Sequence, residues 1–104
     1  MKSPLYNRVL LKLSGEILAG ENSFGIDPKQ AKYLANEIST IYKLGIGIGL
    51  IIGAGNIFRG IKASDQGMDR VTGDYLGMLA TIINAISLQD ALEKINCQTR
   101  TLSA

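Results

Sequence analysis

The chain contains no histidine and no tryptophan, and it has one cysteine among its 104 residues. Without histidine it lacks the commonest general base, most catalytic metal sites and the base of every Ser-His or Cys-His pair. A single cysteine cannot form a disulfide within the chain, which is typical of a reducing compartment. Chemistry performed by these residues must therefore depend on positioning and electrostatics. With no histidine to activate it, Cys97 is expected to be a small buried apolar residue and not a catalytic thiol.

The chain also has little net charge and few aromatic residues. Eleven basic and nine acidic side chains leave a net charge of +2, and the basic residues are scattered. This charge is too small to indicate a nucleic-acid or membrane surface, and four tyrosines and two phenylalanines offer no base-stacking platform. We see no signal peptide, and the apolar runs are much shorter than the roughly 20 residues that span a bilayer. The sequence predicts a cytoplasmic protein that binds neither nucleic acid nor membrane.

Apolar patterns predict alternating strands and helices. Residues 8–13 and 46–52 are nearly continuous apolar runs, as in buried strands of a parallel sheet. Residues 16–26 are polar and predict a loop. From Asp74 to about residue 95, apolar side chains surround most of a long helix, which we expect to be largely buried, partly against another subunit or further chain. Residues 98–102 resemble a third strand.

The first helix has the clearest boundaries. Asp27 can cap free N–H groups, Pro28 suits the first helical position, and Gln30 follows the cap by three residues, as in a capping box. Gly45 can end the helix in the left-handed conformation. The apolar face expected to lie on the sheet consists of Ala31, Leu34, Ala35, Ile38 and Tyr42.

The element order is strand, helix, strand, helix, strand, which predicts an α/β fold with a parallel sheet flanked by helices. The chain ends at residue 104, directly after the last predicted strand and without a closing helix. We therefore expect residues 1–104 to be the amino-terminal portion of a larger single domain.

Two glycine-bearing segments follow the first two strands. Ligands of open parallel sheets bind beyond the carboxyl ends of the strands, so both segments should face one crevice. In the first, Gly15 would let the backbone approach a phosphate, and Lys12 would supply a positive charge. Alternatively, Lys12 is a lysine whose ammonium extends to solvent from an edge strand.

The second segment runs from Gly53 to Gly60 and contains Arg59. Glycines after a buried strand let N–H groups point at an anion, and arginine can make paired hydrogen bonds to phosphate oxygens. The alternative is a tight turn with a surface arginine. The chain has no G-x-x-x-x-G-K-[ST] loop, and Phe58 stands where a dinucleotide fingerprint requires Gly or Ala. P-loop chemistry and NAD binding are thus disfavoured.

A third polar segment, residues 69–75, leads into the long helix. Asp74 could accept hydrogen bonds from ribose hydroxyls. Its alternative role is an N-cap or first-turn carboxylate that complements the helix dipole, and this segment alone favours that alternative.

These segments together resemble the bacterial UMP kinases, in the same order along the chain from about residue 8. The fold group that contains them, the amino acid kinase fold, also includes acetylglutamate and carbamate kinases. The matching segments are Leu11-Lys12-Leu13-Ser14-Gly15-Glu16, Phe24-Gly25-Ile26-Asp27, Gly55-Asn56-Ile57-Phe58-Arg59-Gly60, Asp69-Arg70, Gly73-Asp74 and Gly77-Met78-Leu79-Ala80-Thr81.

The resemblance implies a three-layer fold and a role for each matching residue. Lys12 and Arg59 would be catalytic, while Ala54 and Asp74 would contact UMP. The chain departs from the family at Ala54, where the family usually has glycine, so the methyl group could narrow the UMP site. The residues that would line the ATP phosphates are Lys12, Leu13, Ser14, Gly15, Gly55 and Arg59. The stretch that would match a region of allosteric GTP or UTP regulation is Gly20, Glu21, Asn22, Ser23, Phe24 and Gly25.

The resemblance also implies phosphoryl transfer from ATP to UMP, giving UDP in pyrimidine biosynthesis, by a homo-hexamer. The nucleophile would be a UMP phosphate oxygen, which needs no general base because the second pKa of a phosphate monoester is about 6. Mg²⁺ would be held mainly by the nucleotide phosphates, without a dedicated protein site. Two alternatives stay open: a kinase of this fold that acts on a carboxylate or carbamate, and a non-catalytic nucleotide-sensing module.

Overall fold

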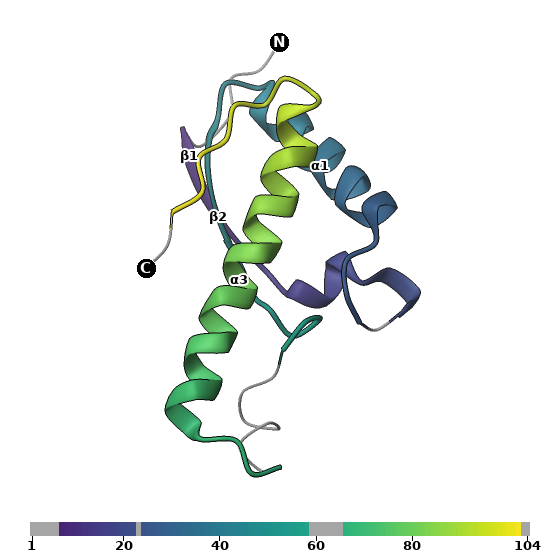
Figure 1. Cartoon of the computed structure of the whole chain (residues 1–104). Coiled ribbons are helices and arrows are strands. Elements are labelled where there is room, and N and C mark those ends of the chain that lie inside the picture. Colours follow the sequence, from purple (N-terminus) through teal and green to yellow (C-terminus); the bar gives the residue numbers. More distant parts are fainter. Residues whose placement is uncertain (1–6, 23, 59–65, 103–104) are drawn as a thin grey trace.

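The computed structural model describes residues 7–22, 24–58 and 66–102 (Figure 1). Within them lie two strands, two short 3₁₀ helices and two α-helices. In chain order these are β1 (Arg8–Leu13), η1 (Gly15–Leu18), η2 (Gly20–Asn22), α1 (Pro28–Tyr42), β2 (Gly47–Ile52) and α3 (Arg70–Glu93). The α/β class and both strands are as predicted, but the expected loop at residues 16–26 contains η1 and η2.

The strands β1 and β2 pair in parallel, with Leu13 opposite Ile52 at their carboxyl ends. Because side chains alternate along a strand, one face carries Leu13, Ile52 and their even-spaced neighbours toward the helices. On the other face, Leu10 is 62% exposed and Ile51 is 50% exposed. In the described part of the chain, helices therefore cover one face of the sheet, whereas the apolar runs predicted helices on both faces. Both described α-helices, α1 and α3, lie on the covered face, where they pack against each other in a single core.

The helix α1 begins as predicted. The Asp27 carboxylate accepts a hydrogen bond from the Lys29 N–H at 2.9 Å, and Pro28 takes the first helical position. The helix ends at Tyr42, and Gly45 follows with a φ of 84°, the left-handed conformation that glycine adopts without strain. The buried residues of its inner face are Ala31, Leu34, Ala35, Ile38 and Ser39.

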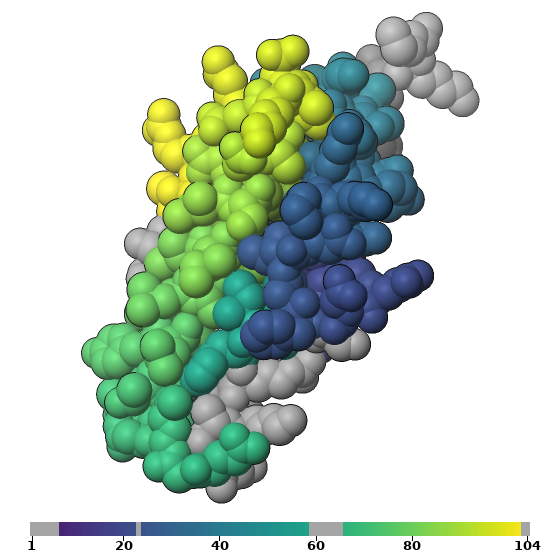
Figure 2. Space-filling view, turned by 45° about the vertical axis from the view of Figure 1, so that its right-hand side comes forward, coloured from purple at the N-terminus to yellow at the C-terminus, as the bar shows by residue number. Residues whose placement is uncertain are grey.

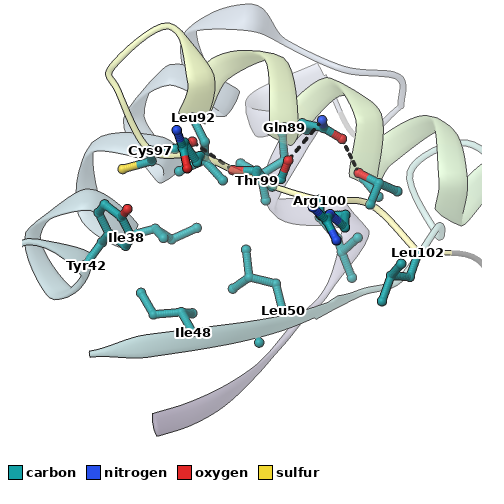
Figure 3. Close-up of a pocket in the computed structure, with 16 residues that line it drawn as sticks. Ile38, Tyr42, Ile48, Leu50, Gln89, Leu92, Cys97, Thr99, Arg100 and Leu102 are labelled. Atoms are coloured by element: carbon teal, nitrogen blue, oxygen red, sulfur yellow. Dashed lines mark hydrogen bonds between the residues drawn. The ribbon is translucent and has the colours of Figure 1, made fainter. Parts of the chain in front are cut away.

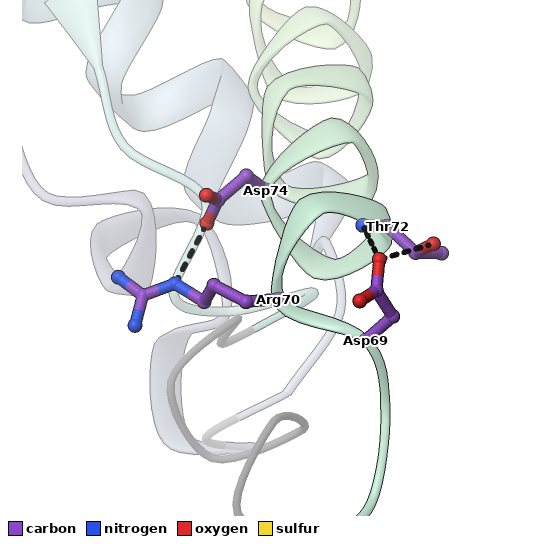
Figure 4. A network of polar contacts seen from close by, with 4 residues as sticks. All are labelled: Asp69, Arg70, Thr72 and Asp74. Carbon is purple, nitrogen blue, oxygen red and sulfur yellow. Dashed lines mark hydrogen bonds and ion pairs between the residues drawn. The ribbon is translucent and has the colours of Figure 1, made fainter.

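The helix α3 begins at Arg70, four residues before the predicted start. Its N-cap is Asp69, whose carboxylate accepts hydrogen bonds from the Thr72 N–H at 3.3 Å and the Thr72 hydroxyl at 3.4 Å (Figure 4). At the other end Asn96 has a φ of 65°, and the Cys97 N–H donates to the Leu92 carbonyl at 3.0 Å. This pattern of bonds is the Schellman closure of a helix.

One side of α3 is packed and the other is exposed. The green-to-yellow α3 lies along the blue α1 in Figure 2, and its inward residues include Ala80, Asn84, Leu88 and Leu92. The prediction of a largely buried helix is therefore only half right within the described residues. By length and composition alone α3 could cross a membrane, but core helices of soluble proteins pass the same test. The exposed apolar side chains of its outer face include Val71, Tyr75, Leu79, Ile83 and Ile86.

Residues 98–102 do not form the predicted third strand. The Gln89 amide donates to the Thr99 carbonyl at 3.2 Å and accepts from the Thr101 hydroxyl, so side-chain bonds hold this segment to α3 (Figure 3). A cavity of about 450 Å³ separates the segment from Ile48 and Leu50 of β2. Cys97 lies at one end of this region and is buried in the core, as predicted.

Candidate functional site

The two glycine segments meet at the carboxyl ends of the strands, as predicted from the strand order. The Gly53 N–H donates to the Leu13 carbonyl at 2.9 Å, which continues the pairing of β1 and β2 beyond their last residues. A Cβ atom on Gly15 would lie 2.5 Å from Asn56 Oδ1 and 2.8 Å from the Gly53 carbonyl carbon. Gly15 is therefore required because the second segment packs directly against it. The close approach to a phosphate that we expected for Gly15 stays a prediction.

The first segment turns away from β1 directly after Leu13. Ser14 caps η1, and its hydroxyl oxygen accepts a hydrogen bond from the Glu16 N–H at 3.3 Å. Lys12 is exposed on the face of β1 that α1 and α3 leave uncovered. The Lys12 ammonium is thus accessible from solvent at the same strand end as both glycine segments.

The second segment forms a tight turn around the Ala54 carbonyl, which accepts hydrogen bonds from the Ile57 and Phe58 N–H groups at 2.9 Å each. Ala54 is only 9% exposed. Among the described non-glycine residues, Asn96 alone has a positive φ, so the Ala54 methyl group causes no backbone strain. Gly55 is half-buried in this turn. The predicted catalytic residue Arg59 lies outside the described residues.

Asn56 and Asn84 form a buried pair beneath this turn, and both are 0% exposed. The Asn56 amide donates to Asn84 Oδ1 at 3.1 Å, and the Asn84 amide donates to Asn56 Oδ1 at 2.7 Å. Asn56 Nδ2 also donates to the Gly25 carbonyl at 2.8 Å, and Asn84 Nδ2 donates to the Gly53 carbonyl at 2.7 Å. This pair connects the second glycine segment to α3 and to the turn at Gly25.

No motif or periodicity in the sequence identifies these two residues as a structural pair, and Asn56 stands out only as a member of the motif at residues 55–60. The available signal was Asn84 itself, the only amide side chain between Tyr75 and Leu88 in a mostly apolar helix. A buried amide in such a helix requires a polar partner, but the sequence does not identify that partner.

The segment from Gly20 to Gly25 lies next to the second glycine segment. Gly20 and Gly25 have φ values of 61° and 80°, and the Gly25 N–H donates to the Asn56 carbonyl at 2.7 Å. Glu21 and Asn22 belong to η2, and the Phe24 side chain is 71% exposed. Ser23 lies outside the described residues. Of the five described residues in this segment, Gly25 makes hydrogen bonds with Asn56 of the second glycine segment.

Asp74 is neither the N-cap nor a first-turn residue of α3, because the cap is Asp69. Its carboxylate is 3.2 Å from the Arg70 Nε in an ion pair whose side chains are 64% and 61% exposed (Figure 4). One turn farther along, a Cβ atom on Gly77 would lie 4.0 Å from Phe58. The beginning of α3 is thus adjacent to the end of the second glycine segment. Ribose binding by Asp74 stays a prediction.

No three His, Cys, Asp or Glu side chains among residues 7–22, 24–58 and 66–102 lie close enough to hold a metal ion together. The candidate site instead brings the main chain of two turns together at the strand end where Lys12 is exposed. The N–H groups of Gly53, Ile57 and Phe58 donate to carbonyls within the fold, and anion binding at this place stays a prediction.

Curated proteins similar to this chain are uridylate kinases. The chain is 53% identical over 103 residues to a uridylate kinase of Alcanivorax borkumensis, and the match covers 99% of this chain and 41% of that protein. It is 54% identical over 101 residues to a uridylate kinase of Marinobacter nauticus, covering 97% of this chain and 42% of that protein. The chain therefore spans about two fifths of the length of these relatives.

Similar solved structures are UMP kinases. The structure from Bacillus anthracis matches with a TM-score of 0.78 and 46% identity, covering 86% of this chain and 36% of that chain. The one from Ureaplasma parvum matches with a TM-score of 0.78 and 38% identity, covering 88% and 38%. The amino acid kinase family model matches residues 7–104. This match includes nearly the whole sequence, and the chain belongs to the amino acid kinase family.

Proposed function

We propose that the protein containing this chain transfers the γ-phosphoryl group of ATP to UMP. The observation that carries this proposal is the packing of Gly15 against Gly53 at the carboxyl ends of two adjacent parallel strands. This edge of an open α/β sheet is where such folds bind ligands. The substrate class follows from the likeness to proteins that are named uridylate kinases.

On the donor side, the ATP phosphates lie along the two glycine segments, with Lys12 and Arg59 as the catalytic cations. Support comes from Lys12, which is exposed at the strand end where the segments meet. A phosphate oxygen of UMP attacks the γ-phosphorus, and the bond from that phosphorus to the bridging oxygen breaks, releasing ADP. The cations offset repulsion between the two polyanions and stabilise charge on the transferring group. The residues proposed to line the donor site are Lys12, Leu13, Ser14, Gly15, Gly55 and Arg59.

On the acceptor side, Ala54 lies beside UMP and Asp74 accepts hydrogen bonds from its ribose hydroxyls. Support comes from the proximity of Gly77 to Phe58, because it places the beginning of α3 next to the second glycine segment. The exposed Arg70–Asp74 pair is weak in water, so a ribose can compete for the carboxylate at little cost.

Magnesium in this proposal is bound mainly through the nucleotide phosphates. Magnesium usually keeps several waters and is held by substrate phosphates with one or two carboxylates, so phosphate binding needs no cluster of protein ligands. When bound, the ion neutralises phosphate charge, while Lys12 and the main-chain groups orient the donor.

The proposal further includes a cytoplasmic homo-hexamer in pyrimidine nucleotide biosynthesis, regulated by GTP or UTP through residues 20–25. Support for assembly is the apolar face of α3 that the described residues leave exposed, because contiguous exposed apolar side chains favour protein contact. Support for regulation is the pair of hydrogen bonds between Gly25 and Asn56, one donated by each residue, which joins that segment to the proposed site. The mass of the native particle tests the hexamer.

The test of function is steady-state transfer by the full-length protein with ATP and Mg²⁺. UMP, acetylglutamate and carbamate are offered separately, and ADP release and product formation are measured. We expect UDP from UMP and no phosphorylation of the carboxylate or the carbamate. Transfer to either of those acceptors in place of UMP would overturn the substrate assignment, and nucleotide binding without transfer would indicate a sensing module.

A further inference from the structure

The Asn56–Asn84 pair is a fully used hydrogen-bonding unit. Each amide nitrogen has two N–H groups, and all four donate to acceptors at 2.7 to 3.1 Å. Flipping the Asn84 amide would place its oxygen against the Gly53 carbonyl oxygen. Flipping Asn56 would do the same at the Gly25 carbonyl. Because both flips bring two acceptors together, the network permits one orientation of each side chain.

The pair fixes the separation of four segments. Asn84 joins α3 to the Gly53 carbonyl, and Asn56 joins the Gly25 turn to the same region. Gly15 of the first glycine segment packs against the two atoms that this network holds, the Gly53 carbonyl oxygen and Asn56 Oδ1. A displacement of Asn84 would therefore move the surface on which the first segment rests.

We propose that the Asn56–Asn84 pair is the positioning unit of the phosphoryl-transfer site. It holds the two glycine segments at the spacing required for in-line transfer, and neither side chain touches the nucleotides. This inference rests on the proposed function. Misplacement of reacting groups by about 1 Å can lower a rate by about 10²-fold, so the loss of one hydrogen-bonding partner should be visible in kcat.

A purely structural role makes a different prediction. If the buried pair only stabilises the fold, breaking it would lower the melting temperature and would not change kcat of the molecules that stay folded. Leu92 provides the matched control, because it lies about two turns beyond Asn84 on the same helix, is 3% exposed and lines the cavity beside residues 98–102. Leu92→Ala should thus lower the melting temperature and leave kcat unchanged.

The experiment compares Asn84→Ala with Leu92→Ala in the full-length protein, below the melting temperature of both. We expect kcat of Asn84→Ala to fall by about tenfold to 10²-fold with KM for ATP and UMP changed less. Hydrogen exchange at the Gly25 and Gly53 amides should be faster in Asn84→Ala than in Leu92→Ala. Equal kcat and equal exchange in the two variants would overturn the proposal.

The test also covers two other outcomes: a variant that does not fold and a protein that does not phosphorylate UMP. If Asn84→Ala does not fold, Asn84→Ser takes its place, because the hydroxyl retains one donor in a smaller side chain, and the same comparison applies. If the unmodified full-length protein does not phosphorylate UMP, the proposed function fails. The exchange rates at Gly25 and Gly53 still decide whether the pair positions these segments, and unchanged rates would refute it.

Discussion

Replacing Gly15 with alanine is expected to destabilise the protein, because the new methyl group has no room. It would lie 2.5 Å from Asn56 Oδ1 and 2.8 Å from the Gly53 carbonyl carbon. Atoms at these distances must move apart, and neither obstacle moves easily. The Gly53 N–H is bonded to the Leu13 carbonyl, and Asn56 is completely buried with its amide fully bonded.

The size of the effect follows from this contact. Overpacking a well-packed interior typically costs about 1 to 3 kcal/mol, and a collision with main chain belongs at the upper end, about 2 to 3 kcal/mol. In a protein of about 150 to 250 residues, each kcal/mol lowers the melting temperature by about 2 to 4 °C. We therefore expect a decrease of about 4 to 12 °C, together with a lower kcat because the two glycine segments are forced apart.

The assay is thermal melting of the full-length variant beside steady-state kinetics. Gly47→Ala is the matched control, because a Cβ atom there would meet the Arg8 side chain at 3.4 Å, an ordinary contact. Gly47 lies outside the left-handed region, so alanine should be neutral there or stabilise slightly.

Equal melting temperatures and equal kcat values for Gly15→Ala and the unmodified protein would refute a collision at Gly15. An unchanged melting temperature with a raised KM for ATP alone would instead restore the first interpretation of Gly15, in which the backbone approaches a phosphate.

Three further substitutions follow from the site, and a fourth serves as a control. Asp74→Asn should weaken UMP binding about tenfold by calorimetry, since charge-assisted hydrogen bonds become neutral ones, and should leave ATP binding unchanged. Its control is Asp90→Asn, which removes an exposed ion pair of the same kind with Lys94 at the other end of α3. This substitution should change neither UMP affinity nor ATP affinity. Asp69→Ala should lower the free energy of unfolding by about 1 kcal/mol in denaturant titrations through loss of the α3 cap. Ala54→Gly should be tolerated with an equal or lower KM for UMP; a large increase in KM would mean that the Ala54 methyl group packs usefully against the substrate.

Local signals in the sequence were sufficient for much of the fold. The start of α1 follows from the cap at Asp27 and the proline at its first position, and its end follows from Gly45. The strand ends of β1 and β2 were also predicted, and with them the meeting of the two glycine segments. The helix boundaries and strand ends each depend on a few neighbouring residues, and the meeting of the segments follows from the shared edge at which parallel strands end.

The features that were wrong or missed depend on side-chain hydrogen bonds, which the pattern of apolar residues does not reveal. The start of α3 was placed at Asp74, because the apolar pattern begins there, but the Asp69 carboxylate bonded to Thr72 extends the helix by a turn. The strand expected at residues 98–102 was wrong, and that segment instead makes hydrogen bonds to the Gln89 side chain of α3. The Asn56–Asn84 pair joins residues 28 positions apart, which periodicity cannot detect.

The most direct test of the account is the role of Lys12 in phosphoryl transfer, with Arg8 as its control. Both residues lie on β1 and are exposed on the same uncovered face, but Arg8 begins the strand and Lys12 is near the carboxyl end. In the full-length protein, Lys12→Ala should lower kcat for UDP formation by about 10² to 10³-fold, as expected for loss of a charge that stabilises the transferring group. Arg8→Ala should stay within about twofold of the unmodified protein, because it lies away from the strand end where ligands bind. Equal kcat values for the two variants would contradict the assignment of phosphoryl transfer to the carboxyl ends of β1 and β2.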